Sequence, residues 1–429
     1  MTISSNKWAN WAGTATTRPR QIAAPRDVDE LADLVARTRE RDGRIKAVGA
    51  GHSFTAIAAA ADILVRLDGY QPAPVVDEAA RRVTVGAGTT LRDLNRLLAE
   101  HGLALPNLGD IDVQTIAGAV ATGTHGTGAD LGGLATFVTG LTMVDGTGIV
   151  HRYQDDDPDL AAVAVNLGAL GIVTDITLQC VPAFRLHADE RPMRLARVLE
   201  EFDTLAADND HFEFYWFPRS DRALVKRNNR EGHAPPLSKM RGWFDDEFLS
   251  NQVFGLMCRL GKATPRLVPA ITAVSSRAQS ARSYTDRSDR VFCSPRKVRF
   301  VEMEYAVPRA AYNEAFAGVR KAADRHRVVF PVEVRVAAAD DTWMSTAYGR
   351  DSAYFAVHQF QGMPYLDYFA EVEAVMRDLG GRPHWGKLHT RAASDLVGDY
   401  PRMAEFTRLR DRLDPDRLFI NPYLQRILG

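Results

Sequence analysis

The sequence is poor in cysteine, which sets limits on its compartment and on its chemistry. Among 429 residues there are three, Cys180, Cys258 and Cys293, and no two of them form a Cys-x-x-Cys pair. A sparse and odd-numbered set argues against a disulfide framework and against a zinc ribbon. It is typical of a protein from a reducing compartment, so we expect a cytoplasmic location.

An excess of one charge is also missing. The 53 Lys and Arg residues are balanced by 54 Asp and Glu residues, which gives a formal net charge of -1. This balance carries no electrostatic signature of a protein that binds nucleic acid or an anionic membrane. The basic stretch "RVFCSPRKVRF" is interpreted as the solvated face of a strand, so we expect no nucleic-acid partner.

Long apolar runs are absent as well. The most apolar stretch, "LAAVAVNLGALGIVTDITL", contains Asn166 and Asp175 and is interpreted as a helix followed by a strand. We therefore expect no membrane span. The first residues, "MTISSNKWANWAG", lack the basic and apolar regions of a signal peptide, which agrees with the expected cytoplasmic location.

What the chain does have is length and two kinds of pattern. A chain of 429 residues is too long for one ordinary core, so we expect two domains. Up to about Pro182, short strand patterns alternate with helical patterns. Beyond it, aromatic-rich strands such as "HFEFYWFP" and "VVFPVEVRVA" indicate an antiparallel sheet with helices on one side. The fold class is therefore α+β.

Two glycine-rich loops indicate close approach of the backbone to a ligand. Gly49 and Gly51 lie in "AVGAGHSF", and "GTHGTG" begins at Gly123. A Rossmann dinucleotide site is excluded, because the third glycine of its fingerprint is missing and the order is helix, strand, loop, strand. Two interpretations stay open: tight turns in a sheet, or anion-binding turns along a groove for an extended dinucleotide such as FAD. In the second, His52 is placed to reach the flavin; in the first it is structural.

Four phrases resemble one family along the whole chain. "NWAG", "AVGAGHSF", "QTIAGAVATGTHGTG" and "HWGKLH" are similar to the sugar-lactone oxidase and alditol oxidase branch of the vanillyl-alcohol-oxidase-type FAD-linked oxidoreductases. "STAYGRD", "RPHWGK" and "RDRLDPDR" resemble actinobacterial L-gulono-1,4-lactone dehydrogenases. The resemblance implies a two-domain FAD-linked oxidase fold. Residues 1–182 would form the FAD-binding domain, 183–389 a substrate (cap) domain, and 390–429 a C-terminal segment that completes the FAD-binding domain.

The resemblance also implies which residues hold the cofactor. His52 corresponds to the histidine that carries the flavin covalently through its 8α-methyl group. A cysteinyl link of the kind found in berberine-bridge-type relatives is excluded, because no cysteine precedes Cys180. The other residues expected to contact FAD are Gly49, Ala50, Gly51, Ser53, Phe54, Thr115, Gly118, Gly123, Thr124, His125, Gly126 and Ile172.

Candidate catalytic residues follow from two motifs. In "PVEVRV", Glu333 and Arg335 share one strand face about 7 Å apart, where an acid and a guanidinium can jointly hold a lactone or polyol. A surface ion pair is the alternative, and the family's matching Glu-x-Arg favours the active site. Lys387 in "HWGKLH" is either a solvated loop lysine or, as the family implies, a cation beside the flavin that stabilises developing negative charge.

Four further positions bear on the expected site. His358 matches a family active-site histidine loosely and is otherwise structural. His384 and His389 flank Lys387 without an evident carboxylate partner, so we expect no metal site. Gly109 matches a position where a small residue admits oxygen in relatives, which leaves oxidase and dehydrogenase behaviour both open.

The reaction that the resemblance implies is oxidation of an aldono-1,4-lactone, such as L-gulono-1,4-lactone, at its C2 carbinol. The hydride passes to flavin N5, and the electrons then pass to oxygen or to a cytochrome- or quinone-type carrier. An alditol oxidase that acts on xylitol- or sorbitol-type polyols is the enzymatic alternative. A non-enzymatic flavin-binding module is the other alternative, although it would have no use for a buried acid, guanidinium and lysine.

Overall fold

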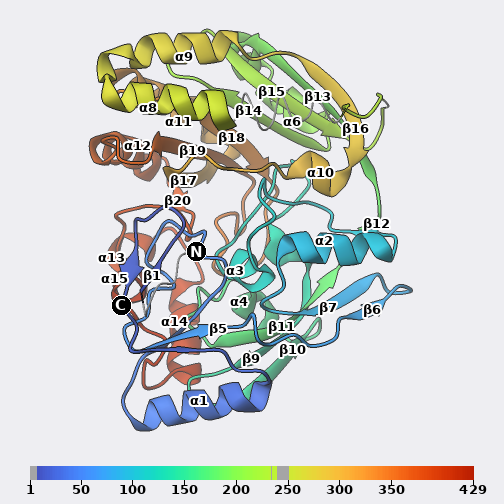
Figure 1. Ribbon diagram of the computed structural model, residues 1–429, viewed down its shortest axis with the longest axis vertical. Coiled ribbons are helices and arrows are strands. Elements are labelled where there is room, and N and C mark those ends of the chain that lie inside the picture. The colour runs from blue at the N-terminus through green and yellow to red at the C-terminus, as the bar shows by residue number, and fades with distance from the viewer. Residues whose placement is uncertain (1–6, 233, 239–250) are drawn as a thin grey trace.

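The computed structural model describes residues 7–232, 234–238 and 251–429. It consists of two blocks, one above the other in the view of Figure 1. The lower block contains the N-terminal segment up to residue 182 together with the C-terminal segment from residue 384, so the blue and red ends of the chain lie together. The upper block contains the strands and helices between Arg185 and Pro383.

The lower block is built on two main sheets. The first is parallel, in the order β3-β5-β4. The second is antiparallel, in the order β10-β9-β11-β7-β6, and the short pairs β1-β2 and β12-β8 flank the two. The strands are β1 (Trp8–Ala9), β2 (Thr16–Thr17), β3 (Gln21–Ala23), β4 (Ile45–Val48), β5 (Ile63–Arg66), β6 (Val75–Asp77), β7 (Arg82–Gly86), β8 (Leu103–Ala104), β9 (Val138–Val144), β10 (Val150–Gln154), β11 (Ile172–Gln179) and β12 (Val181–Pro182).

Three helices in the N-terminal segment of this block begin at side chains that cap them. Asp27, Thr90 and Thr115 each accept a hydrogen bond from the backbone N–H three residues ahead, which satisfies one of the unpaired donors of a helix start. The helices of the lower block are α1 (Val28–Glu40), α2 (Leu91–Glu100), α3 (Ile116–Ala121), η1 (Leu134–Phe137), α4 (Leu160–Ala164), α13 (Ala393–Leu396), α14 (Met403–Leu413) and α15 (Pro422–Leu428).

One expected helix is shorter than its pattern suggests. The helix expected over "DPDLAAVAVNLGAL" is limited to α4, because Leu167 and Gly168 take positive φ angles of 59° and 60° and reverse the chain. Asn166 stabilises this turn, since its side chain donates to the carbonyl of Val163 and accepts from the N–H of Gly168.

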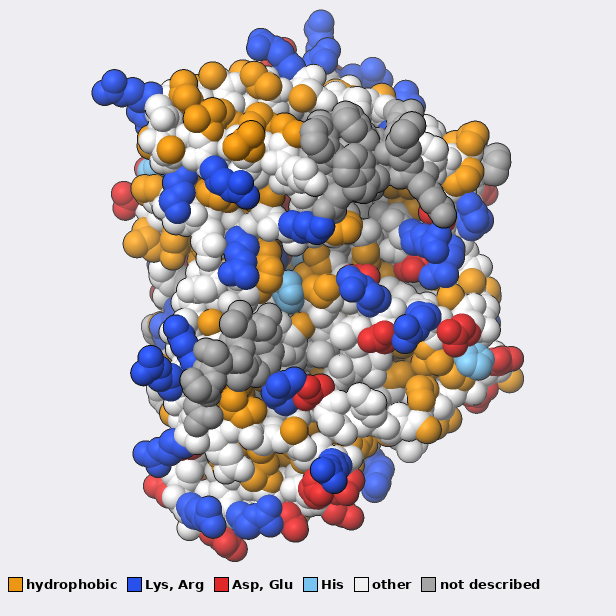
Figure 2. All heavy atoms as spheres, in the orientation of Figure 1, with side chains coloured by type: hydrophobic (Ala, Val, Ile, Leu, Met, Phe, Trp, Pro, Cys, Tyr) orange, Lys and Arg blue, Asp and Glu red, His pale blue; other side chains and the backbone are white. Residues whose placement is uncertain are grey.

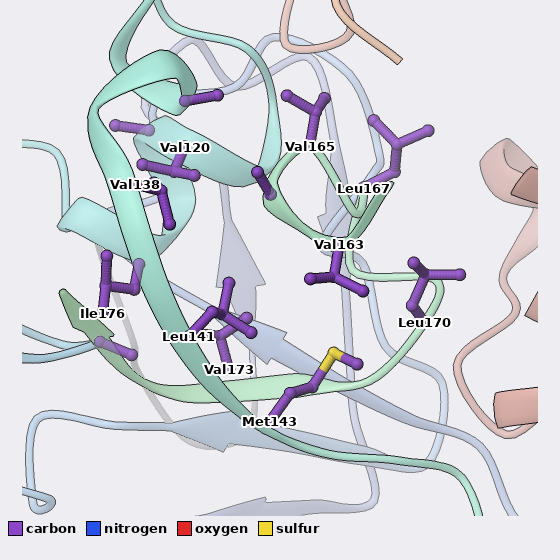
Figure 3. Close-up of a cluster of buried hydrophobic side chains, with 14 of the residues drawn as sticks. Val120, Val138, Leu141, Met143, Val163, Val165, Leu167, Leu170, Val173 and Ile176 are labelled. Carbon is purple, nitrogen blue, oxygen red and sulfur yellow. The ribbon is translucent and has the colours of Figure 1, made fainter. Parts of the chain in front are cut away.

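The core of the lower block joins chain segments far apart in sequence. Figure 3 shows Leu141 and Met143 of β9 close to Val163 of α4, beside Val173 of β11. The same cluster of buried apolar side chains takes in residues of α14 and α15, among them Phe406, Leu409, Leu424 and Ile427. The C-terminal segment thus packs into this core, as its short length predicts.

The upper block contains one antiparallel sheet of eight strands, in the order β16-β13-β15-β14-β18-β19-β17-β20. Its strands are β13 (Arg185–Arg194), β14 (His211–Trp216), β15 (Arg222–Asn229), β16 (Arg282–Arg287), β17 (Phe300–Pro308), β18 (Val332–Ala337), β19 (Ser352–Phe360) and β20 (Arg382–Pro383). Its helices are α5 (Leu195–Glu200), α6 (Phe202–Ala207), α8 (Phe254–Ala263), η3 (Pro265–Leu267), α9 (Val268–Arg277), α10 (Ser288–Phe292), η4 (Arg309–Ala311), α11 (Tyr312–Arg325) and α12 (Leu366–Asp378).

Alternation along the strands separates the two faces of this sheet. Val332, Val334 and Val336 pack with α5, α6, α11 and α12 in one apolar cluster. Intervening residues such as Glu333 point to the opposite face, where Gly128 of the lower block bridges to Ala337 of β18. The expected sheet with helices on one side is confirmed, and its other face meets the lower block. Among the described residues, no helix has both the length and the apolar character needed to cross a membrane.

Candidate active site

A cleft of about 310 Å³ opens beside the glycine loop that follows β4. The loop lines the cleft together with residues of α3 and of the turn before β11. Of the residues expected to contact FAD, the ones that line this cleft are Gly49, Ala50, Gly51, His52, Ser53, Thr115, Gly118 and Ile172. The fold therefore brings together loops that lie about 120 positions apart along the chain.

Glycine is required at two positions of the loop for different reasons. A Cβ atom on Gly49 would lie 2.1 Å from Oγ1 of Thr115, so this close approach of loop and helix admits no side chain. Gly51 has a φ of +71°, which lies in the left-handed region that favours glycine. The loop is thereby fixed against the start of α3, with its backbone facing the cleft.

The residues of the cleft fit an extended cofactor that carries phosphates. Lys46 is buried in its wall, where burial lowers the pKa of the amine to about 7, and its Nζ donates to the carbonyl of Gly168 at 2.6 Å. The Nε1–H of Trp8 is buried in the same wall and has no acceptor among the described residues. A donor without a partner and a buried cation suit a ligand rich in acceptor oxygens and ring nitrogens.

His52 lies at one end of this cleft, against an indole ring. Its ring stacks on Trp11 with centroids 5.5 Å apart and planes inclined by 23°. Burial, with a smaller contribution from the charge of Lys387, lowers the pKa of His52 to about 4. The imidazole is therefore neutral at pH 7, and a ring nitrogen keeps its lone pair.

The other expected cofactor residues lie where the two blocks meet, outside the lining of the cleft. Phe54 stacks on Phe300 with ring centroids 5.7 Å apart, and Nζ of Lys387 lies 5.1 Å from the centre of the Phe54 ring. A Cβ atom on Gly109 would contact both Thr124 and His125 at 3.4 Å. Gly123 and Gly126 lie in the loop between α3 and η1, which contacts the upper sheet where Gly128 bridges to Ala337.

Glu333 and Arg335 form a buried cluster with residues of neighbouring strands. The Oε1 of Glu333 lies 2.5 Å from Nε of Arg335, and the same nitrogen donates to Oε2 of Glu213 at 2.7 Å. Strand pairing sets this contact, because Glu213 of β14 lies opposite Arg335 of β18. Both Glu333 and Arg335 are less than 10% exposed, at 6% and 8%, which excludes the solvated surface pair.

Of the carboxylates around the guanidinium of Arg335, that of Glu333 has the highest pKa. Burial raises the pKa of Glu333 to about 7, and the charges of Asp110 and Glu213 add to the rise that Arg335 opposes. In Glu213 the attraction of Arg335 and Lys226 outweighs burial and lowers the pKa. The cluster thus contains one carboxyl group that titrates near neutral pH.

A second buried network contains Lys387 and His358. The Nζ of Lys387 lies 2.5 Å from Oε2 of Glu302, and Nε2 of His358 lies 3.4 Å from Oε1 of the same residue. The Nδ1 of His358 donates to the carbonyl of Pro331 at 3.1 Å. Burial disfavours the charged imidazole, but Glu302 outweighs it and raises the pKa of His358. Lys387 is therefore held in a fixed ion pair rather than solvated.

Several acidic partners in these networks escaped the sequence analysis. Glu302 and Glu304 alternate with the apolar Val301, Met303 and Tyr305 along β17. This is the pattern that singled out Glu333 and Arg335, so the same signal would have found them. Asp110 follows Gly109 directly and has no comparable signal.

The interpretation of "RVFCSPRKVRF" as the solvated face of a strand is wrong, because the stretch runs from the end of α10 through a loop and only its last residue, Phe300, belongs to β17. Arg296 lies in the loop before β17 and forms an ion pair with Asp110 of the lower block. The loop crosses between the blocks, and Ser294 of the same segment donates its N–H to the carbonyl of Asp110. The basic stretch therefore contributes to the site.

The expectation that His384 has no carboxylate partner is also wrong. His125, Glu304 and His384 are buried with side-chain nitrogens and oxygens within 4.8 Å of one another, close enough to share a metal ion. However, Nδ1 of His384 accepts the N–H of Gly386 at 3.0 Å, which leaves the hydrogen on Nε2. We therefore interpret these three side chains as a hydrogen-bonded cluster rather than as metal ligands. Within it, Nε2 of His125 donates to Oε1 of Glu304 at 3.1 Å. His389 instead contacts the hydroxyl of Tyr423.

Comparison with known proteins identifies the family. Residues 176–427 match the family model described as D-arabinono-1,4-lactone oxidase. The chain belongs to this family. Residues 19–154 match the model described as an FAD binding domain, which confirms FAD as the cofactor that the family resemblance implies.

Two relatives and one solved structure define the resemblance further. The chain is 42% identical over 426 residues to L-gulono-1,4-lactone dehydrogenase of Mycobacterium tuberculosis, covering 98% of this chain and 99% of that protein. It is 31% identical over 436 residues to alditol oxidase of a Streptomyces species, covering 98% of both. Cholesterol oxidase of Brevibacterium sterolicum superimposes with a TM-score of 0.85 at 20% identity, covering 99% of this chain and 97% of that one. This last likeness concerns the fold alone and confirms the expected two-domain FAD-linked oxidase architecture.

Proposed function

We propose that this protein oxidises an aldono-1,4-lactone, L-gulono-1,4-lactone or a similar sugar lactone, at its C2 carbinol. The observation that carries the proposal is the convergence of three groups on one buried place between the blocks. Asp110 interacts electrostatically with both Arg335 and Lys387, and His358 interacts with both Glu333 and Lys387. An acid, a guanidinium and an amine thus surround one polar space, next to the cleft that fits FAD.

Each group has a distinct task in this reaction. Glu333 accepts hydrogen bonds from the substrate hydroxyls, and its pKa of about 7 suits it to receive the proton of the reacting hydroxyl. Arg335 polarises the lactone carbonyl or the reacting oxygen. Lys387 stabilises the negative charge that develops during the reaction, and its ion pair with Glu302 keeps it in place. When bound, FAD supplies the acceptor for the hydride of the carbinol C–H.

Aromatic side chains form an apolar wall beside His52. Trp11, Phe54 and Phe300 pack against one another with ring centroids 5.3 to 6.2 Å apart. An apolar wall strengthens the electrostatic interactions of the charged groups behind it. It also fixes the position of the substrate C–H, which contributes much of the rate in reactions of this kind.

We further propose that His52 carries FAD covalently. The neutral imidazole on the edge of the cleft supports this, because a free ring nitrogen is what such a bond requires. Denaturation of the purified protein in acid, followed by filtration, tests the bond. Yellow colour should stay with the wild-type chain and pass into the filtrate for His52→Ala. Release of the colour from the wild-type chain would show that no bond exists.

Three expectations remain proposals of the same kind. The FAD-binding domain would comprise residues 1–182 and 390–429 with the cap domain between them, in line with the core shared by the two segments. A cytoplasmic location is supported by Cys180, Cys258 and Cys293, which are all free thiols. Oxygen or a cytochrome- or quinone-type carrier would take the electrons, with Gly109 leaving room for oxygen.

Alditol oxidation is the second candidate, since the carboxylates of Glu213 and Glu333 suit a chain of hydroxyls. Anaerobic mixing with lactones and alditols separates the two. Bleaching of the flavin absorbance by L-gulono-1,4-lactone or D-arabinono-1,4-lactone, and not by xylitol or sorbitol, supports lactone oxidation; the reverse result would refute it. Subsequent exposure to air reports whether oxygen accepts the electrons. Glu333→Gln should abolish most of the bleaching, whereas Glu314→Gln, on the exposed face of α11, should leave it unchanged.

A further inference from the structure

Helices α8 and α9, with η3 between them, expose a group of large apolar side chains at the outer end of the upper block. Leu256, Leu260, Leu267 and Val274 are 63%, 48%, 39% and 56% exposed. Figure 2 shows orange side chains gathered over these two helices. The other large apolar residues exposed in the described parts of the chain lie singly on separate elements. A contiguous group of this kind marks an interaction surface.

The same surface is basic, although the chain as a whole is nearly neutral. Four exposed cations lie among the apolar residues: Arg259, Lys262, Arg266 and Arg277. No Asp or Glu occurs between positions 251 and 285. None of the four cations forms an ion pair with a described residue, and Nζ of Lys262 donates to the carbonyl of Gln361. Positive charge is therefore concentrated on α8, η3 and α9, although the chain as a whole is nearly neutral.

The exposed leucines are not needed to hold the helices in place. The opposite side of α8 buries Gly255, Cys258 and Gly261. A Cβ atom on Gly261 would lie 3.0 Å from Val329, which shows how closely this side approaches the sheet. The helix is thus anchored by small residues on one side, and the larger apolar residues are left free for another contact.

A second copy of the chain is a poor match for this surface. A twofold contact would place the four cations of one copy against those of the other, and these helices contain no acid to pair with them. An anionic bilayer accepts both kinds of side chain, because leucines enter the boundary of the acyl chains while lysines and arginines contact the headgroups. We propose that the surface formed by α8, η3 and α9 binds the face of an anionic lipid membrane.

The surface lies close to the wall of the candidate active site. Phe254 of α8 contacts Phe330 with ring centroids 5.0 Å apart, and Phe330 contacts Phe300 at 5.3 Å. Phe300 packs against Trp11, which stacks on His52. Three aromatic rings, those of Phe254, Phe330 and Phe300, therefore connect the helix that would contact the membrane to Trp11 and His52. The binding itself does not depend on the proposed reaction.

Flotation with lipid vesicles tests the proposal with the full-length holoprotein. The protein should float with vesicles of phosphatidylglycerol and phosphatidylcholine and not with vesicles of phosphatidylcholine alone. Binding should fall when the salt concentration rises from about 0.05 M to about 0.5 M, because the headgroup charge is then screened. Leu256→Ser with Leu260→Ser, and separately Arg259→Gln with Lys262→Gln, should each reduce the bound fraction at least about tenfold.

Two controls keep the outcome unambiguous. Leu366→Ser removes an equally exposed leucine from α12 and should not change vesicle binding. Flavin content should be unchanged in every variant, which shows that each one is folded. Failure of the wild-type protein to float with anionic vesicles would overturn the proposal, as would unchanged flotation of both double variants. A dimer that Leu256→Ser with Leu260→Ser converts to a monomer would also overturn it, since the surface would then be a subunit interface.

Discussion

The carboxylate of Glu302 lies between Lys387 and His358, with one oxygen 2.5 Å from Nζ and the other 3.4 Å from Nε2. Strand pairing brings the acid and the histidine together, because Glu302 of β17 lies opposite His358 of β19. Lys387 comes from the segment after β20, where His384 and Leu388 donate their N–H groups to the carbonyls of Glu304 and Glu302. A single buried acid therefore positions a lysine and a histidine at the junction of the blocks.

Replacing Glu302 by Gln should impair the reaction without removing any group that contacts substrate. Glutamine keeps the size of the side chain but carries no negative charge, so Lys387 loses its fixed position and the pKa of His358 falls. We expect kcat to decrease about 10- to 100-fold, with a smaller change in KM. The step that His358 contributes to the pH profile of kcat/KM should disappear or move to lower pH.

The control for this variant is another glutamate–histidine pair. Glu371 on α12 lies 3.0 Å from His326, but its side chain is 38% exposed, so Glu371→Gln should leave both kcat and the pH profile unchanged. A purely structural role for Glu302 would lower thermal stability and leave the pH profile of the surviving activity intact. That pattern would contradict the assignment of Glu302 as a positioning residue.

The raised pKa of Glu333 predicts how activity depends on pH. The carboxylate accepts hydroxyl hydrogen bonds only when ionised, and burial raises its pKa to about 7. The value of kcat/KM should therefore rise as the pH increases through about 7 and level off above it. Glu333→Gln should remove this rise and lower kcat/KM by about 10²- to 10⁴-fold. A rise that persists in Glu333→Gln would assign the titration to a different group.

The sequence predicted the parts of this site that carry a local pattern. Glycine spacing marked the loop after β4 as a place of close backbone approach, the family resemblance made it the cofactor loop, and alternation in "PVEVRV" placed Glu333 and Arg335 on the face opposite the valines. Asp110 and Arg296 carry no such signal, because their significance arises only where two loops from different blocks meet. Alternation along β17 marks Glu304 as a polar position, but it does not reveal its partner His125, which lies 179 positions away. The period of apolar residues along a helix or strand indicates which side chains face the core. It does not indicate which other segment packs against the polar face.

The close contact between Gly49 and Thr115 predicts that Gly49→Ala impairs FAD binding and that a second substitution, at Thr115, restores it. The added methyl group of Gly49→Ala would overlap Oγ1 of Thr115 at 2.1 Å, which forces the loop away from α3. We expect loss of FAD and a destabilisation of about 1–3 kcal/mol. Thr115→Ala removes that oxygen, so the double variant should regain FAD content relative to Gly49→Ala. Gly398→Ala, where a Cβ atom meets nothing within 4 Å, is the control. Normal FAD content in Gly49→Ala would show that the loop does not depend on this contact.

Asn421 connects the C-terminal segment to the chain just beyond His52. Its Nδ2 donates to the carbonyls of Ala56, Ile57 and Ala59 at 3.0 to 3.1 Å, while its Oδ1 caps α15 by accepting the N–H of Leu424. Ser keeps the cap and loses the donors, whereas Ala loses both. We expect Asn421→Ala to destabilise the protein by about 2–3 kcal/mol, because a cap is lost and buried carbonyls are left unpaired.

The serine variant separates these two contributions. Asn421→Ser should keep α15 in place and still lower FAD content, because residues 56–59 lose their anchor directly after the cofactor loop. Thermal unfolding and flavin absorbance of the purified variants measure both effects, with Asn313→Ala on the exposed face of α11 as the control. Equal FAD content in Asn421→Ser and wild type would mean that the C-terminal segment stabilises the block without supporting the cofactor loop. A bipartite FAD-binding domain requires the opposite result, since its second part would then contribute to holding FAD.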